Sequence, residues 1–198
     1  QPMSDRVGHG TQMGLIAAGL VRPIGAKAED GGQVPLVAIR AMDDNGFTTD
    51  FTIMKSVEYA MESGARVLNI SWGSETKSDF LEAILVRAAD GGMVVVASAG
   101  NEPTGRPVYP AAYPSVIGVG ALYPDGKTWE KSNFGRSVDL YAPGFANVPV
   151  GYHGDPGMYG GTSISAAFTA NRIAEYLSRY PKSSFEEVED AVNDTMPR

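Results

Sequence analysis

The chain has 198 residues, a formal net charge of −7 and no cysteine, so it can bury a sizeable core but forms neither disulfides nor cysteine metal sites. Its composition, 43% hydrophobic and 20% charged, is typical of a soluble globular protein, and we expect a single domain over residues 1–198. Because Lys and Arg do not cluster and no apolar run reaches about 18 residues, neither nucleic acid nor a membrane is an expected partner.

Along the chain, helical apolar periodicity alternates with short apolar runs that are typical of strands. The predicted order is a helix over residues 11–19, a strand over 33–41, a helix over 48–63, a strand over 66–72, a helix over 78–90, strands over 93–98 and 116–121, and closing helices over 162–179 and 184–194. Residues 101–114 and 143–161 are rich in Gly, Pro and Tyr, which predicts loops.

This alternation predicts an α/β fold, in which a parallel sheet lies between helices on both faces and forms a three-layer domain. The run MVVVAS at residues 93–98 is almost entirely apolar, as expected for a strand that is covered on both sides. Ligands of such sheets bind beyond the carboxyl ends of the strands. Two predicted strands end near residues 71–73 and 98–101, so a site is expected there.

The first candidate for chemistry is a histidine between two glycines. His9 stands in the segment Gly-His-Gly-Thr, at the start of the first predicted helix. The pKa of imidazole lies near neutrality, which suits a general base. A surface histidine at a helix start is the alternative interpretation. The second histidine, His153, lies in a Gly-rich loop and is expected to face solvent.

A serine opens the long helix predicted over residues 162–179. Ser163 follows two glycines and a threonine, and the partial positive charge and N–H groups of a helix N-terminus could stabilise the product of its attack. A helix cap is the common alternative for a serine in this position. Ser165 is a rival nucleophile, but it lies further into the helix and lacks the preceding glycines.

An asparagine follows the most apolar strand. Asn101 comes after Ala99 and Gly100, and a carboxamide at the end of a buried strand can donate a hydrogen bond to a developing oxyanion. An asparagine in a turn is the alternative. Together the three candidates supply a base, a nucleophile and an amide donor, which is a set suited to acyl transfer.

The motifs Gly-His-Gly-Thr, Ala-Gly-Asn and Gly-Thr-Ser, in this order, resemble those of the subtilisin-like serine proteases, or subtilases. The connecting segments VLNISWGS, YPAAYPSVIGVGAL and SNFGRSVDLYAPG are similar to that family too, so the resemblance runs from residue 5 to the C-terminus. It implies a subtilisin-like fold and a serine endopeptidase that acts on polypeptides through an acyl-enzyme. Ser163 would be the nucleophile, His9 the general base, and Asn101 with the Ser163 N–H the oxyanion donors.

The same resemblance implies a substrate cleft. The implied substrate-binding residues are Ser71, Trp72 and Gly73, which would lie along an extended peptide, together with Ser98, Ala99 and Gly100. We expect no cofactor. We also expect no metal site, because the family's usual calcium-binding loop is not recognisable after the first helix. Secretion is implied by the family alone.

The main departure of the sequence from the family lies at the N-terminus. The subtilase triad begins with an aspartate well before the histidine motif, whereas here the only earlier carboxylate is Asp5, four residues from His9, which we interpret as a loop residue. We therefore expect an N-terminally truncated domain that lacks the first strand. That segment was removed, lies on another chain, or never existed, and a pro-segment or second chain is the candidate partner.

Two functions follow from these observations. One is a serine endopeptidase domain trimmed at its N-terminus. The alternative is a catalytically impaired module that binds peptides or assembles with a partner. A hydrolase with a Gly-x-Ser-x-Gly turn is disfavoured, because the second glycine is absent around Ser163.

Overall fold

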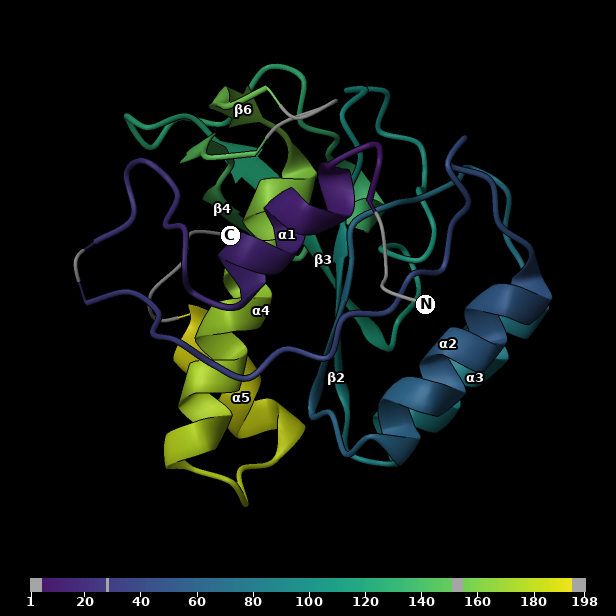
Figure 1. The fold of residues 1–198 in the computed structure, drawn as a ribbon. Helices are drawn as coiled ribbons and strands as arrows, with labels where there is room; N and C mark the ends of the chain where they lie inside the picture. Colours follow the sequence, from purple (N-terminus) through teal and green to yellow (C-terminus); the bar gives the residue numbers. More distant parts are fainter. Residues whose placement is uncertain (1–4, 28, 151–154, 194–198) are drawn as a thin grey trace.

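The computed structural model describes residues 5–27, 29–150 and 155–193. Its centre is a four-stranded parallel sheet in the order β1–β2–β3–β4. The strands are β1 (Val67–Ile70), β2 (Val94–Ser98), β3 (Val116–Leu122) and β4 (Leu140–Pro143). All four point toward the same end of the molecule (Figure 1), so the predicted parallel α/β sheet is confirmed.

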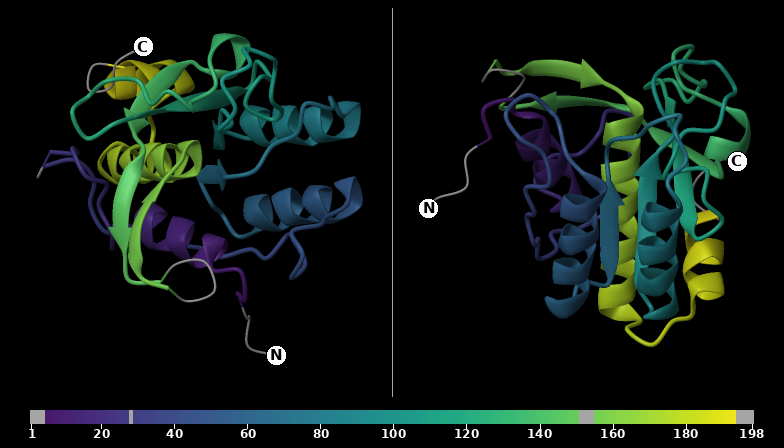
Figure 2. Two further views of the ribbon diagram at one scale, coloured as in Figure 1. Left: turned by 90° about the horizontal axis from the view of Figure 1, so that it is seen from above. Right: turned by 90° about the vertical axis from the view of Figure 1, so that its right-hand side faces the viewer.

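Helices cover both faces of this sheet (Figure 2). One layer contains α1 (His9–Ala17), α4 (Thr162–Arg179) and α5 (Phe185–Asn193), and the other contains α2 (Asp50–Glu62) and α3 (Asp79–Asp90). Alternation along β2 explains the two layers, because Val94 and Val96 join the first core whereas Val95 and Ala97 join the second. The three-layer prediction is therefore confirmed.

Local sequence sets the starts of α2 and α3. Thr49 Oγ1 accepts a hydrogen bond from Thr52 N at 3.2 Å, and Ser78 Oγ accepts one from Leu81 N at 3.3 Å. Both are N-cap contacts, which satisfy amides that have no partner within the helix. Ser78 Oγ also donates to Asp50 Oδ2 at 2.8 Å, so the two helix starts are joined.

The strand predicted over residues 33–41 is wrong. The segment is irregular, and Leu36 and Val37 are 49% and 43% exposed. A strand needs a neighbouring backbone to complete its hydrogen bonds. In the described part of the chain β1 is an edge strand that pairs only with β2, and no strand there pairs with residues 33–41.

The loop predicted over residues 143–161 is also wrong, because it contains a hairpin. In this hairpin β5 (Phe145–Val148) pairs antiparallel with β6 (Gly157–Gly160). Ala146 and Val148 are buried in the first core, an alternation typical of a half-buried strand. The connection that carries His153 lies outside the described residues. Gly161 N donates to Gly144 O at 2.8 Å, which ties the end of the hairpin to the end of β4.

A buried amide fixes α1 against α4. Asn171 is only 2% exposed, and its Nδ2 donates to Ala17 O at 3.0 Å and to Gly32 O at 2.8 Å. The neighbouring Arg172 forms an ion pair with Asp30. Because α1 begins with the candidate base and α4 with the candidate nucleophile, these contacts help to set the relative placement of the two.

Candidate active site

The three candidate residues come from elements that meet at the carboxyl edge of the sheet. His9 is the first residue of α1, Ser163 is the second residue of α4, and Asn101 lies three residues after the end of β2. Helices α1 and α4 pack together, and both begin at the upper end of the molecule in Figure 1. Asn101 contacts the start of α4 directly.

The hydroxyl of Ser163 faces the segment that follows β1. Ser163 Oγ donates to Ser71 O at 3.3 Å, and Ser71 Oγ donates to Ser163 O at 3.3 Å. The N-cap residue of α4 is Gly161, so Ser163 does not cap this helix. Its N–H is one of the first four of the helix and has no intrahelical acceptor, which makes it available to an anion.

The carboxamide of Asn101 is held at its oxygen end. Asn101 Oδ1 accepts hydrogen bonds from Thr162 N and from Thr162 Oγ1, both at 2.9 Å, and Gly100 N donates to Thr162 Oγ1 at 3.2 Å. A backbone N–H can only donate, so the atom that faces it must be the amide oxygen. The donor Nδ2 therefore lies at the opposite end of the carboxamide.

Space is left beside that donor. Asn101 is exposed, and a Cβ on Gly161 would lie 3.4 Å from Asn101 Nδ2. A glycine at this position keeps the region between the amide and the start of α4 clear of a side chain. An oxyanion hole requires a pair of N–H donors, and Asn101 and Ser163 each have one.

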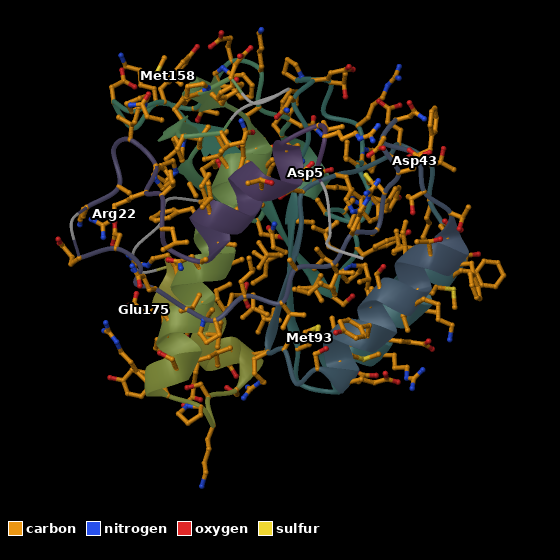
Figure 3. The ribbon with its side chains drawn as sticks, viewed as in Figure 1. Asp5, Arg22, Asp43, Met93, Met158 and Glu175 are labelled. Atoms are coloured by element: carbon orange, nitrogen blue, oxygen red, sulfur yellow. The ribbon has the colours of Figure 1, made fainter. Side chains whose placement is uncertain are left out.

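The imidazole of His9 is half-buried. Its loss of hydration lowers the pKa of His9 below the ordinary value, and the negative charge of Asp5 partly opposes this shift. A lowered pKa keeps the ring neutral at neutral pH, which is the form that accepts a proton. Asp5 itself lies in the loop before α1 (Figure 3).

The segment 71–73 continues β1 as extended backbone. Ser71 and Trp72 are half-buried and Gly73 is exposed. Ser74 then forms a bridge with Tyr109, in which Ser74 N donates to Tyr109 O at 2.9 Å and Tyr109 N donates to Ser74 O at 2.8 Å. This bridge holds the outer end of the segment at a fixed position.

Two of the three predicted substrate residues over 98–100 are buried, and Gly100 is half-buried. Ser98 is 5% exposed and Ala99 is 0% exposed, so neither side chain is accessible. Ala99 N donates to Val119 O at 3.0 Å, and Gly100 N is bound to Thr162 as described above. The N–H groups of Ala99 and Gly100 thus already have acceptors within the protein.

One residue that was not predicted from the sequence holds the loop over residues 99–106 that carries Asn101, here called the asparagine loop. Asn133 is fully buried, and its Nδ2 donates to Ala99 O at 3.1 Å and to Arg106 O at 3.0 Å. Its Oδ1 accepts from Gly105 N at 3.0 Å. No local pattern distinguishes a buried scaffold asparagine from one in a turn, so only the resemblance around SNFG marked this segment.

Within the described residues, no group of three or more His, Cys, Asp or Glu side chains is placed to hold a metal ion. None of the helices in the same part of the chain is both long enough and apolar enough to span a membrane.

The sequence of this chain matches a known protein family. The model of the subtilase family matches residues 1–198. Subtilisin NAT from Bacillus subtilis subsp. natto is 32% identical, and the match covers 98% of this chain and 52% of that protein. Subtilisin from Bacillus pumilus is also 32% identical, with 98% of this chain and 72% of that protein covered. The chain belongs to the subtilase family.

A solved structure described as the self-cleaved protease domain of PatA shares the fold. It has a TM-score of 0.62 and 27% sequence identity, over 71% of this chain and 56% of that chain. The present chain spans about half the length of several relatives, Subtilisin NAT and Subtilisin E among them.

Proposed function

We propose that this chain is the catalytic part of a serine endopeptidase, organised as one domain over residues 1–198. Ser163 is the nucleophile, His9 is the general base, and Asn101 Nδ2 and Ser163 N are the oxyanion donors. The main observation in support is the pair of hydrogen bonds that Asn101 Oδ1 accepts from Thr162. Thr162 precedes Ser163, and because the amide oxygen faces Thr162, the donor Nδ2 lies at the other end of the carboxamide. Family membership supports the same chemistry.

In the proposed reaction, Ser163 Oγ attacks the peptide carbonyl carbon while His9 accepts the hydroxyl proton. The carbonyl oxygen becomes an oxyanion, which the two N–H donors stabilise. His9 then gives the proton to the leaving amine and the C–N bond breaks, which leaves an acyl-enzyme that water hydrolyses by the same steps. The present contact of Ser163 Oγ with Ser71 O, at 3.3 Å, is long for a hydroxyl bond and is therefore readily exchanged for one to the base.

The substrate would be a polypeptide in extended form. Residues 71–73 continue an edge strand, and backbone at a sheet edge binds an added strand through main-chain hydrogen bonds. Family membership also supports an extracellular site of action, which comparison of culture supernatant with cell lysate by immunoblotting would test.

A carboxylate that orients His9 is part of the same proposal. It would come from an upstream segment, a pro-segment or a second chain that adds a strand beside β1. Within the described residues β1 has one strand neighbour, and its Asn69 Oδ1 is buried without a hydrogen-bond partner. An unsatisfied buried acceptor costs about 1–3 kcal/mol, so an added strand that supplies a donor would be stabilised here.

The second candidate function is the impaired module that binds peptides or assembles with a partner. One observation favours it: both oxygens of Asp5 accept hydrogen bonds at the N-terminus of α1, so the carboxylate nearest to His9 in the sequence is engaged in holding the start of the helix. In subtilisin, where the triad has been dissected by mutation, loss of the aspartate costs about 3 × 10⁴ in kcat, whereas loss of the serine or histidine costs about 2 × 10⁶.

Labelling with a fluorophosphonate probe separates the two functions. The probe is applied to the 198-residue chain and to a longer form that includes any upstream coding sequence, with S163A of each as the control. Labelling that S163A abolishes supports the peptidase, including the case in which only the longer form reacts. No labelling of Ser163 in either form supports the module.

A further inference from the structure

A single carboxylate holds the turn that presents His9. Asp5 Oδ1 accepts a hydrogen bond from Gly8 N at 2.9 Å. Its Oδ2 accepts one from Thr11 N at 2.6 Å and another from Thr11 Oγ1 at 2.7 Å. Figure 3 shows Asp5 at the start of α1. The backbone is therefore fixed on both sides of His9, one residue before it and two residues after it.

The helix cannot cap itself at this end. The N-cap residue is Gly8, which has no side chain and adopts a left-handed φ of 87°. The first amides of α1 have no partner within the helix, and a negative charge is favourable at a helix N-terminus. Asp5 supplies both the acceptor and the charge from outside the helix. Two residues of the Gly-His-Gly-Thr segment thus have separate roles: Gly8 permits the turn, and Thr11 donates hydrogen bonds to the Asp5 carboxylate.

We propose that Asp5 is a positioning residue for His9, which fixes the imidazole through the first turn of α1 and does not contact the reacting atoms. The proposal rests on the proposed function, in which His9 is the general base. This role differs from that of a triad aspartate, because Asp5 acts on the main chain and the Thr11 hydroxyl at the start of α1, from which both of its oxygens accept hydrogen bonds.

The electrostatics agree with this role. Partial loss of hydration raises the pKa of Asp5, but hydrogen bonds from Thr11 and Gly8 outweigh it, so the pKa of this carboxyl lies below its ordinary value. Asp5 is therefore ionised at neutral pH. Its charge acts to raise the pKa of His9 against the lowering by burial.

The test uses D5N, which keeps the size of the side chain but removes the charge and one acceptor oxygen. Its matched control is D90N, the same change at the exposed last residue of α3, at the other end of that helix from its Ser78 cap. NMR titration of the two histidines in the 198-residue chain gives the pKa of His9. The rate of fluorophosphonate labelling is measured in whichever form reacts.

We expect D5N to lower the pKa of His9 below the wild-type value and to shift the Thr11 amide resonance. Labelling of Ser163 should slow at least about tenfold, because small misplacements of a catalytic group have effects of this size.

A second pair of variants isolates the hydroxyl contact. T11V loses the donor to Asp5 and should slow labelling, and T11S keeps the donor and should recover most of the lost rate.

The proposal is overturned if D5N matches D90N in the His9 pKa and the Thr11 resonance. If no form of the protein labels, the peptidase proposal fails, and the NMR comparison still decides the role of Asp5. A fall in the His9 pKa with normal folding supports that role even in an inactive chain.

Discussion

At the scale of single residues, the two ends of the Asn101 carboxamide have different tasks. The oxygen joins the asparagine loop to α4, and the nitrogen is the proposed oxyanion donor. N101D separates these tasks, because it keeps the acceptor for Thr162 and replaces the donor. We expect kcat to fall by about 10²–10³, the usual effect of losing one oxyanion donor. A kcat of N101D within a factor of three of wild type would contradict the assignment; thermal denaturation checks that the variant is folded.

The protonation of His9 predicts the pH dependence of activity. Burial lowers the pKa of His9, and only the neutral ring can accept the proton of Ser163. Activity should therefore be lost as the pH falls through the lowered pKa of His9, so the acidic limb of the kcat/KM profile should lie below the ordinary imidazole value of about 6.5. A limb at or above that value would show that burial does not control the base.

At the scale of elements, the junction between α1 and α4 depends on one buried amide. Removing the Asn171 side chain leaves the carbonyls of Ala17 and Gly32 without its two hydrogen bonds. We expect N171A to reduce the free energy of unfolding by about 2–3 kcal/mol. S178A is the matched control, since it removes an exposed hydrogen bond on the same helix and should change stability by less than about 0.5 kcal/mol. Urea denaturation of both variants measures the difference, and equal effects would refute this role of Asn171.

Elements whose patterns are satisfied locally could be predicted from the sequence. The helix predicted over residues 162–179 has the observed bounds, because its apolar stripe and glycine lead-in are contained in the segment itself. Residues 33–41 show the opposite case. Their apolar character is that of a strand, but strand formation depends on a neighbouring strand, and within the described residues no strand pairs with them.

The candidate site shows the same division between motif and scaffold. Three short motifs were enough to nominate His9, Asn101 and Ser163. Asn133 and Asn171 could not be nominated for their contacts, because their hydrogen bonds join segments far apart in the sequence. Asp5 lies only three and six residues from its partners, but the sequence alone indicated no more than a loop residue there. The hairpin of β5 and β6 was hidden by its glycines, although Ala146 and Val148 follow the alternation of a strand.

At the scale of the whole molecule, the sheet has a well-packed centre, and among the described residues its strand β1 has a neighbouring strand on one side only. All residues of β2 and β3 are buried, whereas three of the four residues of β1 are only half-buried. Hydrogen exchange should therefore be slow in β2 and β3, faster in β1, and fastest in residues 33–41 of the 198-residue chain. Addition of an upstream segment that supplies a strand should slow exchange in β1 and in residues 33–41. Unchanged exchange in both would contradict strand addition at this edge.

The central claim is that a hydroxyl, an imidazole and an amide donor from three distant segments act on one carbonyl group. A crystal structure of the protein with a peptidyl boronic acid tests it directly. The account predicts a bond between boron and Ser163 Oγ, a boronate oxygen about 2.7–3.1 Å from both Asn101 Nδ2 and Ser163 N, and a ring nitrogen of His9 within about 3.2 Å of another boronate oxygen or Ser163 Oγ. Boron bound elsewhere, or a His9 ring turned away from the adduct, would contradict it.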